Sequence, residues 1–181
     1  MLTPAPGILL VASPTLVDPN FRRSVVFVVE HSDDGTLGFI INRPLDIPLG
    51  ELWGECPPGL AACLAAADGG PVERDKGLLL HRDLSIPDAA TMGHGIAIGG
   101  ELSAIARRWA DGPDRLGPRL FLGHSGWGPG QLEQECSDGA WLLRPAKADL
   151  LFPPPELVGD RLWEQLSQAL PRGGLSEPSL N

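Results

Sequence analysis

Tyrosine is absent from this sequence, and cysteine occurs only three times, at Cys56, Cys63 and Cys136. An odd number of widely separated cysteines excludes a disulfide-rich secreted scaffold and fits reduced thiols. Neither the Cys56/Cys63 spacing nor the His81/His94 spacing matches a C-x-x-C or H-E-x-x-H motif. The sequence therefore predicts no metal site and no cofactor.

Positive charge is also scarce. Lysine and arginine number 14 against 23 aspartates and glutamates, which gives a formal net charge of −9. Such a field repels polyanions, and the pairs Arg22-Arg23 and Arg107-Arg108 form no stripe that could neutralise several phosphates. Direct binding to nucleic acid is therefore not expected.

Long hydrophobic runs are missing. No stretch approaches the roughly 20 apolar residues of a transmembrane helix. The apolar residues 8–12 follow no lysine or arginine and are too few for a signal peptide, so we interpret them as part of a buried first strand. Lipidation motifs are absent from both ends. These absences predict a cytoplasmic protein that does not associate with a membrane.

Glycine and proline, by contrast, are abundant. Of 181 residues, 23 are glycine, 19 are proline and 43% are hydrophobic. This composition is typical of a globular domain with many turns and short elements. Because the chain contains no repeat and no linker, we predict a single domain over residues 1–170, followed by a flexible tail, residues 171–181.

Three apolar runs near the start predict strands at residues 7–12, 24–31 and 36–42. The last two are joined by Ser32-Asp33-Asp34-Gly35, in which the Asp-Gly pair favours a tight hairpin turn with positive φ. Further strands are expected at residues 77–82, 95–98, 119–123 and 140–144. Helices are expected at residues 48–53, 59–67, 101–110, 129–135 (N-cap Gly128) and 156–170. An early hairpin followed by irregularly placed helices indicates the α+β class.

The string Gly123-His124-Ser125-Gly126-Trp127 resembles the nucleophile elbow of serine hydrolases. The elbow needs glycine two residues after the serine, but position 127 is tryptophan, and all four histidines precede Ser125. Other orders of a catalytic triad stay open. No catalytic residue is assigned, and Ser125 is interpreted as part of a structural turn.

Trp127 is flanked by glycines and is expected in a loop. A large rigid ring in such a turn either fills the domain's own core or anchors a partner. Trp109 and Trp163 lie on or beside apolar helical stripes and are expected in the core.

Taken together, these strings resemble the YqgE/AlgH family of small bacterial proteins over residues 5–170. The segments that carry the resemblance are GILLVASP at 7–14, DPNF at 18–21, EH at 30–31, INRP at 41–44, GGPV at 69–72, GHSGWGPGQLE at 123–133 and AWL at 140–142. Two places depart from the family: His124 replaces a common tyrosine, and residues 59–67 are alanine-rich where relatives tend to form a strand.

The resemblance implies a single α+β domain of coiled, bifurcated, mostly antiparallel β-sheets with interspersed helices. It also implies a cytosolic protein without established enzymatic activity. The AlgH name reflects a proposed regulatory role in alginate synthesis.

The function we favour at this point is a non-enzymatic binding or regulatory protein, with transcriptional regulation as one form of that role. Its candidate surface consists of turn residues, because turns expose backbone groups and side chains for recognition. These residues are Asp18, Pro19, Asn20, His31, Asn42, Arg43, Gly69, Gly70, Pro71, Gly126 and Trp127. The partner would be a protein or a small ligand.

The alternative function is that of a hydrolase or transferase. In this hypothesis His31 or His81 acts as the general base, beside an aspartate such as Asp18. It requires that the fold bring these groups into one cleft.

Overall fold

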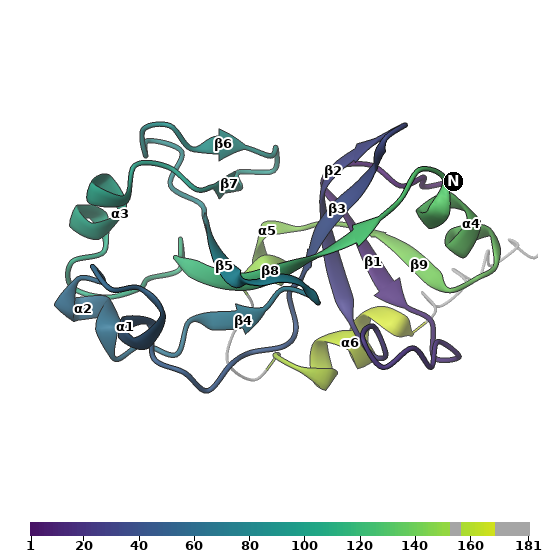
Figure 1. Cartoon of the computed structure of the whole chain (residues 1–181), viewed down its shortest axis with the longest axis horizontal. Helices are drawn as coiled ribbons and strands as arrows, with labels where there is room; N and C mark the ends of the chain where they lie inside the picture. The colour runs from purple at the N-terminus through teal and green to yellow at the C-terminus, as the bar shows by residue number, and fades with distance from the viewer. Residues whose placement is uncertain (153–156, 169–181) are drawn as a thin grey trace, which may run out of the picture.

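One long strand, β8 (Arg119–Trp127), links two groups of strands in the computed structural model of the chain (Figure 1). The structure describes residues 1–152 and 157–168. β8 pairs through its carboxyl end with one group of four strands and through its amino end with a second group of four, called the smaller group because its strands contain fewer residues. The sheet therefore divides in two. All strand pairs but one are antiparallel. This curled, mostly antiparallel sheet with few helices confirms the α+β class.

The four-stranded group has the order β3-β2-β1-β9. It consists of β1 (Ile8–Ala12), β2 (Val25–Ser32), β3 (Gly35–Ile40) and β9 (Trp141–Pro145). The central strands β1 and β2 are runs of aliphatic and aromatic residues, and most of their side chains are buried. Strands that are covered on both faces have this composition.

Three helices accompany this group: α4 (Gln131–Ser137), α5 (Ala148–Leu151) and α6 (Asp160–Ser167). Helix α6 lies against β1 (Figure 1). Trp163 fixes this contact, because its indole Nε1 donates a 2.8 Å hydrogen bond to the Ala12 carbonyl. The ring is 9% exposed, so its predicted place in the core is confirmed.

The smaller group surrounds the amino end of β8. Its strands are β4 (Ala66–Asp68), β5 (Val72–His81), β6 (Ala90–Thr91) and β7 (Ala97–Ile98). Its helices are α1 (Leu49–Leu52), α2 (Pro58–Ala61) and α3 (Leu102–Arg108). Trp109 follows α3 and is 1% exposed, which confirms its predicted place in the core.

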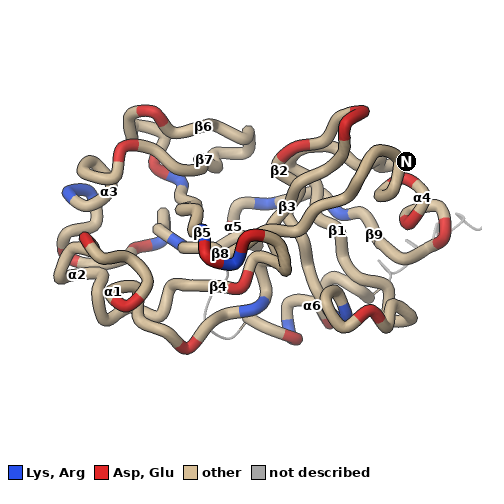
Figure 2. The backbone as a smooth tube through the Cα atoms, viewed as in Figure 1, with Lys and Arg blue, Asp and Glu red and all other residues tan. Residues whose placement is uncertain are grey.

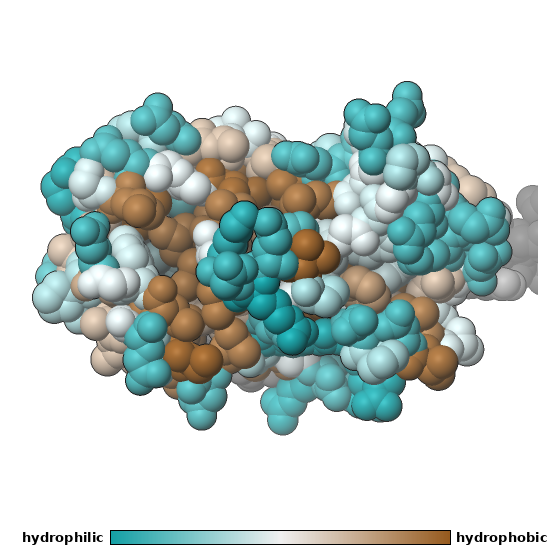
Figure 3. Space-filling view, in the orientation of Figure 1, coloured by the Kyte–Doolittle hydropathy of each residue, from teal (hydrophilic) through white to brown (hydrophobic). Residues whose placement is uncertain are grey.

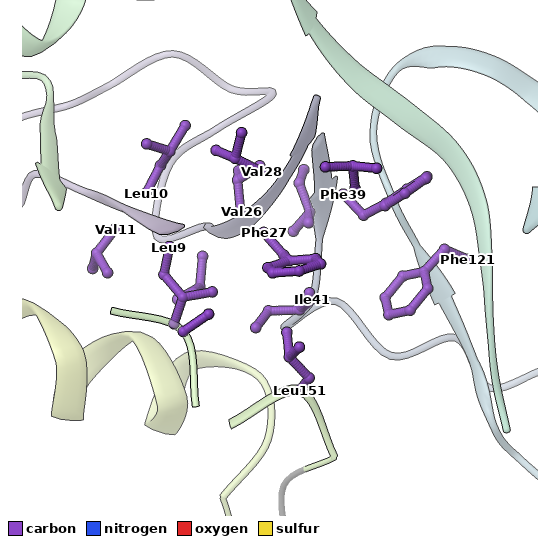
Figure 4. Close-up of a cluster of buried hydrophobic side chains, with 14 of the residues drawn as sticks. Leu9, Leu10, Val11, Val26, Phe27, Val28, Phe39, Ile41, Phe121 and Leu151 are labelled. Atoms are coloured by element: carbon purple, nitrogen blue, oxygen red, sulfur yellow. The ribbon is translucent and has the colours of Figure 1, made fainter. Parts of the chain in front are cut away.

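The apolar interior consists of two clusters, and the larger one also includes Ala67, Leu80 and Ile98 from the smaller group of strands. In the larger cluster, Figure 4 shows Phe27 and Ile41 between Leu9 on one side and Phe121 on the other. Phe121 comes from β8, so this strand contributes to the larger cluster and, through Leu120, to the smaller one. The alternation of side chains along β8 thus joins the two cores.

The predicted hairpin between β2 and β3 is confirmed, since Ser32 pairs with Gly35 across a two-residue loop. The Asp-Gly pair supplies the predicted positive φ, but neither Asp33 nor Asp34, the two residues of the loop, has it. Gly35 instead has φ +138°, and a Cβ there would lie 2.5 Å from the Trp127 carbonyl oxygen. The glycine therefore permits the close approach of β8 rather than the turn itself.

The predicted helix over residues 59–67 is wrong beyond its first residues. Helix α2 ends at Ala61, and β4 begins at Ala66. Ala66 pairs in parallel with Leu120 of β8, and its carbonyl accepts a 2.9 Å hydrogen bond from the Leu45 amide on the other side. Backbone pairing on both edges overrides the helix propensity of alanine.

Several other boundaries also differ from prediction: β5, for example, begins at Val72 and not at Gly77, and β6 and α5 were not predicted. β8 continues from Gly123 to Trp127, so Trp127 lies in a strand and not in a loop. α4 begins at Gln131, because Gly130 with φ +72° takes the N-cap position expected for Gly128. α6 begins at Asp160, and the parts of the predicted last helix at residues 156 and 169–170, like the tail 171–181, lie outside the described residues.

Acidic residues are spread around the whole outline of the molecule (Figure 2). Hydrophobic side chains are more visible on the half with β4 to β7, on both sides of a hydrophilic ridge (Figure 3). Within the described residues, none of the helices has the length and apolar character needed to cross a membrane.

The loop after β5 and the end of α3 are joined by a charged network that predicts an acid-sensitive stability. Arg108 donates from Nε to Asp83 Oδ2 at 2.7 Å and from Nη2 to Asp114 Oδ2 at 2.9 Å. The pKa of Asp83 is lowered by hydrogen bonds from the Ser85 hydroxyl and amide, and further by Arg108. A carboxylate with a lowered pKa stabilises the fold above its unfolded pKa, and this stability is lost as the pH falls through its folded pKa.

We therefore expect Asp83→Asn to lose less unfolding free energy than the wild type as the pH falls below about 4. Urea denaturation at several pH values between 3 and 7 gives the unfolding free energy at each pH, and its slope against pH should be shallower for the variant. The exposed Asp111→Asn is the matched control and should leave the slope as in the wild type. Equal slopes for wild type and Asp83→Asn would contradict the prediction.

Candidate functional site

Asn42 follows β3 and ties three segments together. Its Oδ1 accepts a 2.8 Å hydrogen bond from the Val25 amide, and its Nδ2 donates to the carbonyls of Arg23 (2.9 Å) and Gly159 (3.1 Å). The side chain is 4% exposed. An amide group is required here, because it offers an acceptor and two donors at once. Asn42 is therefore a structural residue of the site and not part of its surface.

Arg43, the next residue, holds the predicted Asp-Pro-Asn turn in place. Its guanidinium donates to the carbonyl of Asn20 (Nη1, 2.6 Å) and to that of Arg22 (Nη2, 3.3 Å). The turn is closed by a 2.7 Å hydrogen bond from the Asn20 amide to Asp18 Oδ1. Two segments that are far apart in the sequence are thereby joined at one half-buried cation.

Four more charged groups lie near enough to affect the pKa of Arg43. Burial lowers this pKa, Asp68 raises it, Arg74 lowers it, and Asp160 and Asp18 raise it. Burial has the largest effect, so the pKa lies below its usual value. The Asp68 amide also donates a 2.9 Å hydrogen bond to the Arg43 carbonyl, so the residue before the Gly-Gly-Pro turn contacts Arg43 directly.

The Gly69-Gly70-Pro71 turn packs against β8 beside this cluster. The Gly69 carbonyl accepts a 3.2 Å hydrogen bond from the Ser125 hydroxyl. Gly70 has φ +146°, and a Cβ there would lie 2.3 Å from the His124 carbonyl oxygen. Only glycine fits this approach. The buried Ser125 is thus a structural residue, although it lies in a strand and not in a turn.

Three predicted turns, at residues 18–20, 42–44 and 69–71, therefore meet around Arg43. We define the arginine face as this cation and the charged side chains near it. Its members are Arg22, Arg23, Arg43, Arg74, Asp18, Asp68 and Asp160. Arg74 pairs with Asp68 at 3.5 Å and Arg23 with Asp160 at 2.8 Å.

A depression of about 640 Å³ adjoins the arginine face. It is lined by Ser13, Pro14, Leu16, Val17, Arg22, Arg23, Asp160 and Trp163. Within the described part of the chain, the exposed Arg22 side chain has no polar partner, whereas the guanidinium of Arg23 lies 5.2 Å from the centre of the Trp163 ring. The sequence interpretation missed the contact between Arg23 and Trp163, because two adjacent arginines without interleaved aromatics are typical of solvated charge.

Trp127 does not belong to this surface. It is 4% exposed in β8, where its ring stacks on Phe21 at 5.6 Å and meets Trp141 edge-on at 5.8 Å. The sequence left two roles open for Trp127, filling the core or anchoring a partner, and the structure supports the first. Phe21 comes from the Asp-Pro-Asn-Phe motif, so this motif and the Gly-Trp motif meet in one aromatic cluster.

Glu135 of α4 is the polar centre of the aromatic cluster. Its Oε2 accepts hydrogen bonds from the indoles of Trp127 (2.9 Å) and Trp141 (2.8 Å), and its Oε1 accepts one from Gln131 (2.9 Å). The next residue, Cys136, is half-buried. Burial, with Glu135 and Glu133 nearby, raises the pKa of the Cys136 thiol to about 11. This thiol therefore stays protonated at neutral pH.

His31 lies at the end of β2 in a row of three polar side chains. Its Nδ1 is 2.7 Å from the Thr36 hydroxyl, and its Nε2 is 3.3 Å from Glu133 Oε1. Thr36 is only 7% exposed. The row borders an open depression of about 480 Å³. The sequence interpretation missed Thr36 and Glu133, because nothing in the local pattern shows that α4 packs over the hairpin.

His81 and Asp18, the other members of the predicted catalytic set, are not brought to His31. His81 is fully buried in the smaller group, where its Nε2 bonds to the Gly99 carbonyl at 2.9 Å. Asp18 closes the exposed turn beside Arg43. Asp18 therefore makes no hydrogen bond or ion pair with His31 or His81 in the part of the chain that the structure describes. Among the described residues, no three His, Cys, Asp or Glu side chains are placed to hold a metal ion.

The predicted surface residues thus fall into three groups. Asp18, Pro19, Asn20, Pro71 and Gly126 are exposed, and His31 and Arg43 are half-buried. The buried ones are Asn42, Gly69, Gly70 and Trp127. The fold brings the first and second turns together with the third. At the carboxyl end of β8, Gly126 is exposed and Trp127 is buried in contact with Phe21.

Known proteins resemble this chain over most of its length. The sequence model of DUF179, an AlgH-like family, matches residues 9–172. The UPF0301 protein SPO0296 of Ruegeria pomeroyi is 40% identical over 81% of this chain and 82% of its own length. The UPF0301 protein AlgH of Pseudomonas aeruginosa is 36% identical over 92% of this chain and 87% of its own length.

Two solved structures have the same fold as this chain over most of its length. The solution structure of AlgH from Pseudomonas aeruginosa has a TM-score of 0.67 at 35% identity and covers 92% of each chain. The crystal structure of protein DIP2367 from Corynebacterium diphtheriae has a TM-score of 0.75 at 26% identity, over 94% of this chain and 90% of that one. The resemblance to YqgE/AlgH proteins is thus confirmed, and the chain belongs to the AlgH-like family DUF179.

Proposed function

We propose that this chain is a non-catalytic cytoplasmic binding protein with a regulatory role, which recognises an acidic segment of a protein partner through the arginine face. One observation carries the proposal: three turns from separate parts of the sequence converge on Arg43, beside a depression in which Arg22 has no polar partner among the described residues. Exposed loops held on a rigid scaffold are common recognition surfaces.

Charge and apolar surface together support an acidic protein segment as the partner. The arginine face carries four arginines and three aspartates, in a chain whose net charge is −9. Val17 is 81% exposed beside Arg22 and offers an apolar contact next to the free cation. Arginine is enriched at the centres of protein interfaces because its planar group binds carboxylates in pairs of hydrogen bonds. Any effect on transcription then follows from this protein contact.

A crosslinking pull-down from cells in which the chain is native tests the proposal. We expect a captured partner to fall by about tenfold or more with Arg22→Glu, because a rim charge is reversed where an acidic segment docks. Arg107→Glu is the matched control, since Arg107 is exposed on α3, in the other group. Equal thermal stability of the two variants separates recognition from folding.

Two results would contradict the proposal. One is a partner that both variants capture as well as the wild type does. The other is the absence of any partner that depends on Arg22 under conditions where the chain is folded.

General base catalysis by His31 is the second candidate function, and the row Thr36–His31–Glu133 favours it. A hydroxyl and a carboxylate on opposite nitrogens would orient the imidazole as in hydrolases. The nearly buried Thr36 hydroxyl argues against attack on a bulky substrate. The rate of hydrolysis of a p-nitrophenyl ester distinguishes the two candidate functions. If the chain is a binding protein, wild type and His31→Gln should have equal rates. If His31 is a general base, His31→Gln should lower the rate by about a hundredfold or more.

A further inference from the structure

Arg119, the first residue of β8, is a partly buried cation without a carboxylate partner among the described residues. Its guanidinium donates to the carbonyls of Leu151 (Nη1, 2.6 Å) and Ile41 (Nη2, 3.0 Å), and lies 5.0 Å from the centre of the Phe121 ring. Burial lowers its pKa to about 10, so it stays charged at neutral pH. Buried charges in proteins are normally paired with an opposite charge.

The hydrogen bonds of Arg119 leave much of its binding capacity free. A guanidinium has five N–H donors in a planar fork. Two of them are used by the carbonyls, and the other three have no acceptor in the part of the chain that the structure describes. The two carbonyls and the aromatic ring hold the group in one orientation. Arg119 therefore presents fixed donors, which is what recognition of a planar anion requires.

Arg119 faces a cavity of about 790 Å³ whose wall is mostly apolar. The wall includes Leu64, Ala66, Pro118, Phe152 and Val158. Ligand sites for small organic molecules have this composition: a largely apolar cleft of several hundred Å³ with a few fixed polar groups.

The other charged residues that line the cavity leave the charge of Arg119 uncompensated. Asp114 already accepts hydrogen bonds from Arg108 and from the Trp109 indole. Asp149 is exposed at the rim and pairs with Arg82 at 3.4 Å. Arg115 is a second cation at the rim, exposed and without a polar partner among the described residues. The cavity thus combines a mostly apolar wall with two arginines, the partly buried Arg119 and the exposed Arg115.

We propose that this cavity binds a small organic carboxylate, with its carboxyl group on the free N–H donors of Arg119 and its hydrocarbon body against the apolar wall. This site is distinct from the arginine face, and the inference does not depend on the function proposed for that face. Binding requires both an ionic contact with Arg119 and apolar contact with the wall. An inorganic anion makes only the first of these contacts, and a neutral hydrocarbon chain makes only the second.

Isothermal titration calorimetry with octanoate, octanamide and inorganic phosphate tests the proposal on the full chain. We expect octanoate to bind, and octanamide and phosphate to bind about tenfold more weakly or not at all, because each lacks one of the two contacts. Arg119→Gln should weaken octanoate binding to the level of octanamide. Chemical shifts of the Arg119 Nε–H group report the contact directly.

A second pair of variants keeps the test independent of the folding of Arg119→Gln. Leu64 lines the cavity and is 60% exposed, whereas Leu84 is 55% exposed and does not line it. Leu64→Glu places a carboxylate at the entrance and should weaken octanoate binding several-fold, while Leu84→Glu should leave it unchanged. Equal binding of octanoate and octanamide, equal binding by both leucine variants, or no binding of octanoate would overturn the proposal.

Discussion

Replacement of Trp127 by alanine is expected to lower the free energy of unfolding by about 3–5 kcal/mol, the usual cost of truncating a buried tryptophan. The ring is 4% exposed and contacts the rings of Phe21 and Trp141. Its loss leaves a cavity in the aromatic cluster and removes one of the three hydrogen bonds to Glu135. Denaturation in guanidinium chloride, followed by circular dichroism, measures the change.

Trp127→Phe separates the two contributions. Phenylalanine retains most of the ring packing but loses the indole donor to Glu135, so we expect a smaller cost of about 1–3 kcal/mol, that of a hydrogen bond to a charged group. The prediction fails if Trp127→Ala costs less than about 1 kcal/mol, since the ring would then contribute no more than a surface side chain.

The burial of Trp127 also decides how recognition can be tested. A variant that loses several kcal/mol approaches the total stability of many domains of this size. Loss of a partner in Trp127→Ala would therefore report unfolding as readily as lost contact. Arg22 lies at the surface of the arginine face and is the informative position.

The sequence allowed the β2·β3 hairpin to be predicted because its signals are local: two apolar runs and a short polar loop between them. β4 escaped prediction for the opposite reason. Its residues, Ala66 to Asp68, have no strand propensity of their own and become a strand only by pairing in parallel with β8, more than fifty residues later. Pairing over such distances leaves no trace in local periodicity.

Trp127 shows the same limit for the site. The glycines on either side suggested a loop, yet the chain stays extended because Gly126 pairs with Leu37 and Trp127 with Thr36 of β3. The turns at residues 18–20, 42–44 and 69–71 could be predicted from their Asp, Asn, Pro and Gly residues. Their convergence on Arg43 could not, since it depends on the packing of β3 between β2 and β8.

Replacement of Asn42 by alanine is the second large effect that we expect, with a loss of about 3 kcal/mol, because three hydrogen bonds of about 1 kcal/mol each disappear and the Val25 amide stays buried without a partner. The Val25 amide and the carbonyls of Arg23 and Gly159 are the partners of Asn42 in these bonds. Urea denaturation measures the change. Asn20→Ala is the matched control, since Asn20 is exposed and contributes backbone groups to the turn rather than its side chain.

The comparison of Asn42→Ala with Asn20→Ala tests whether the buried Asn42 side chain holds the Asp-Pro-Asn turn in place. Asn42 fixes the backbone at Arg23 while Arg43 fixes it at Asn20 and Arg22, so both ends of the Asp-Pro-Asn turn are held by one short segment after β3. If Asn42→Ala cost no more than Asn20→Ala, the turn would be held by other contacts. If it costs about 3 kcal/mol, as three lost hydrogen bonds require, the Asn-Arg-Pro motif is the scaffold of the arginine face, and the exposed arginines around it are free to vary with the partner.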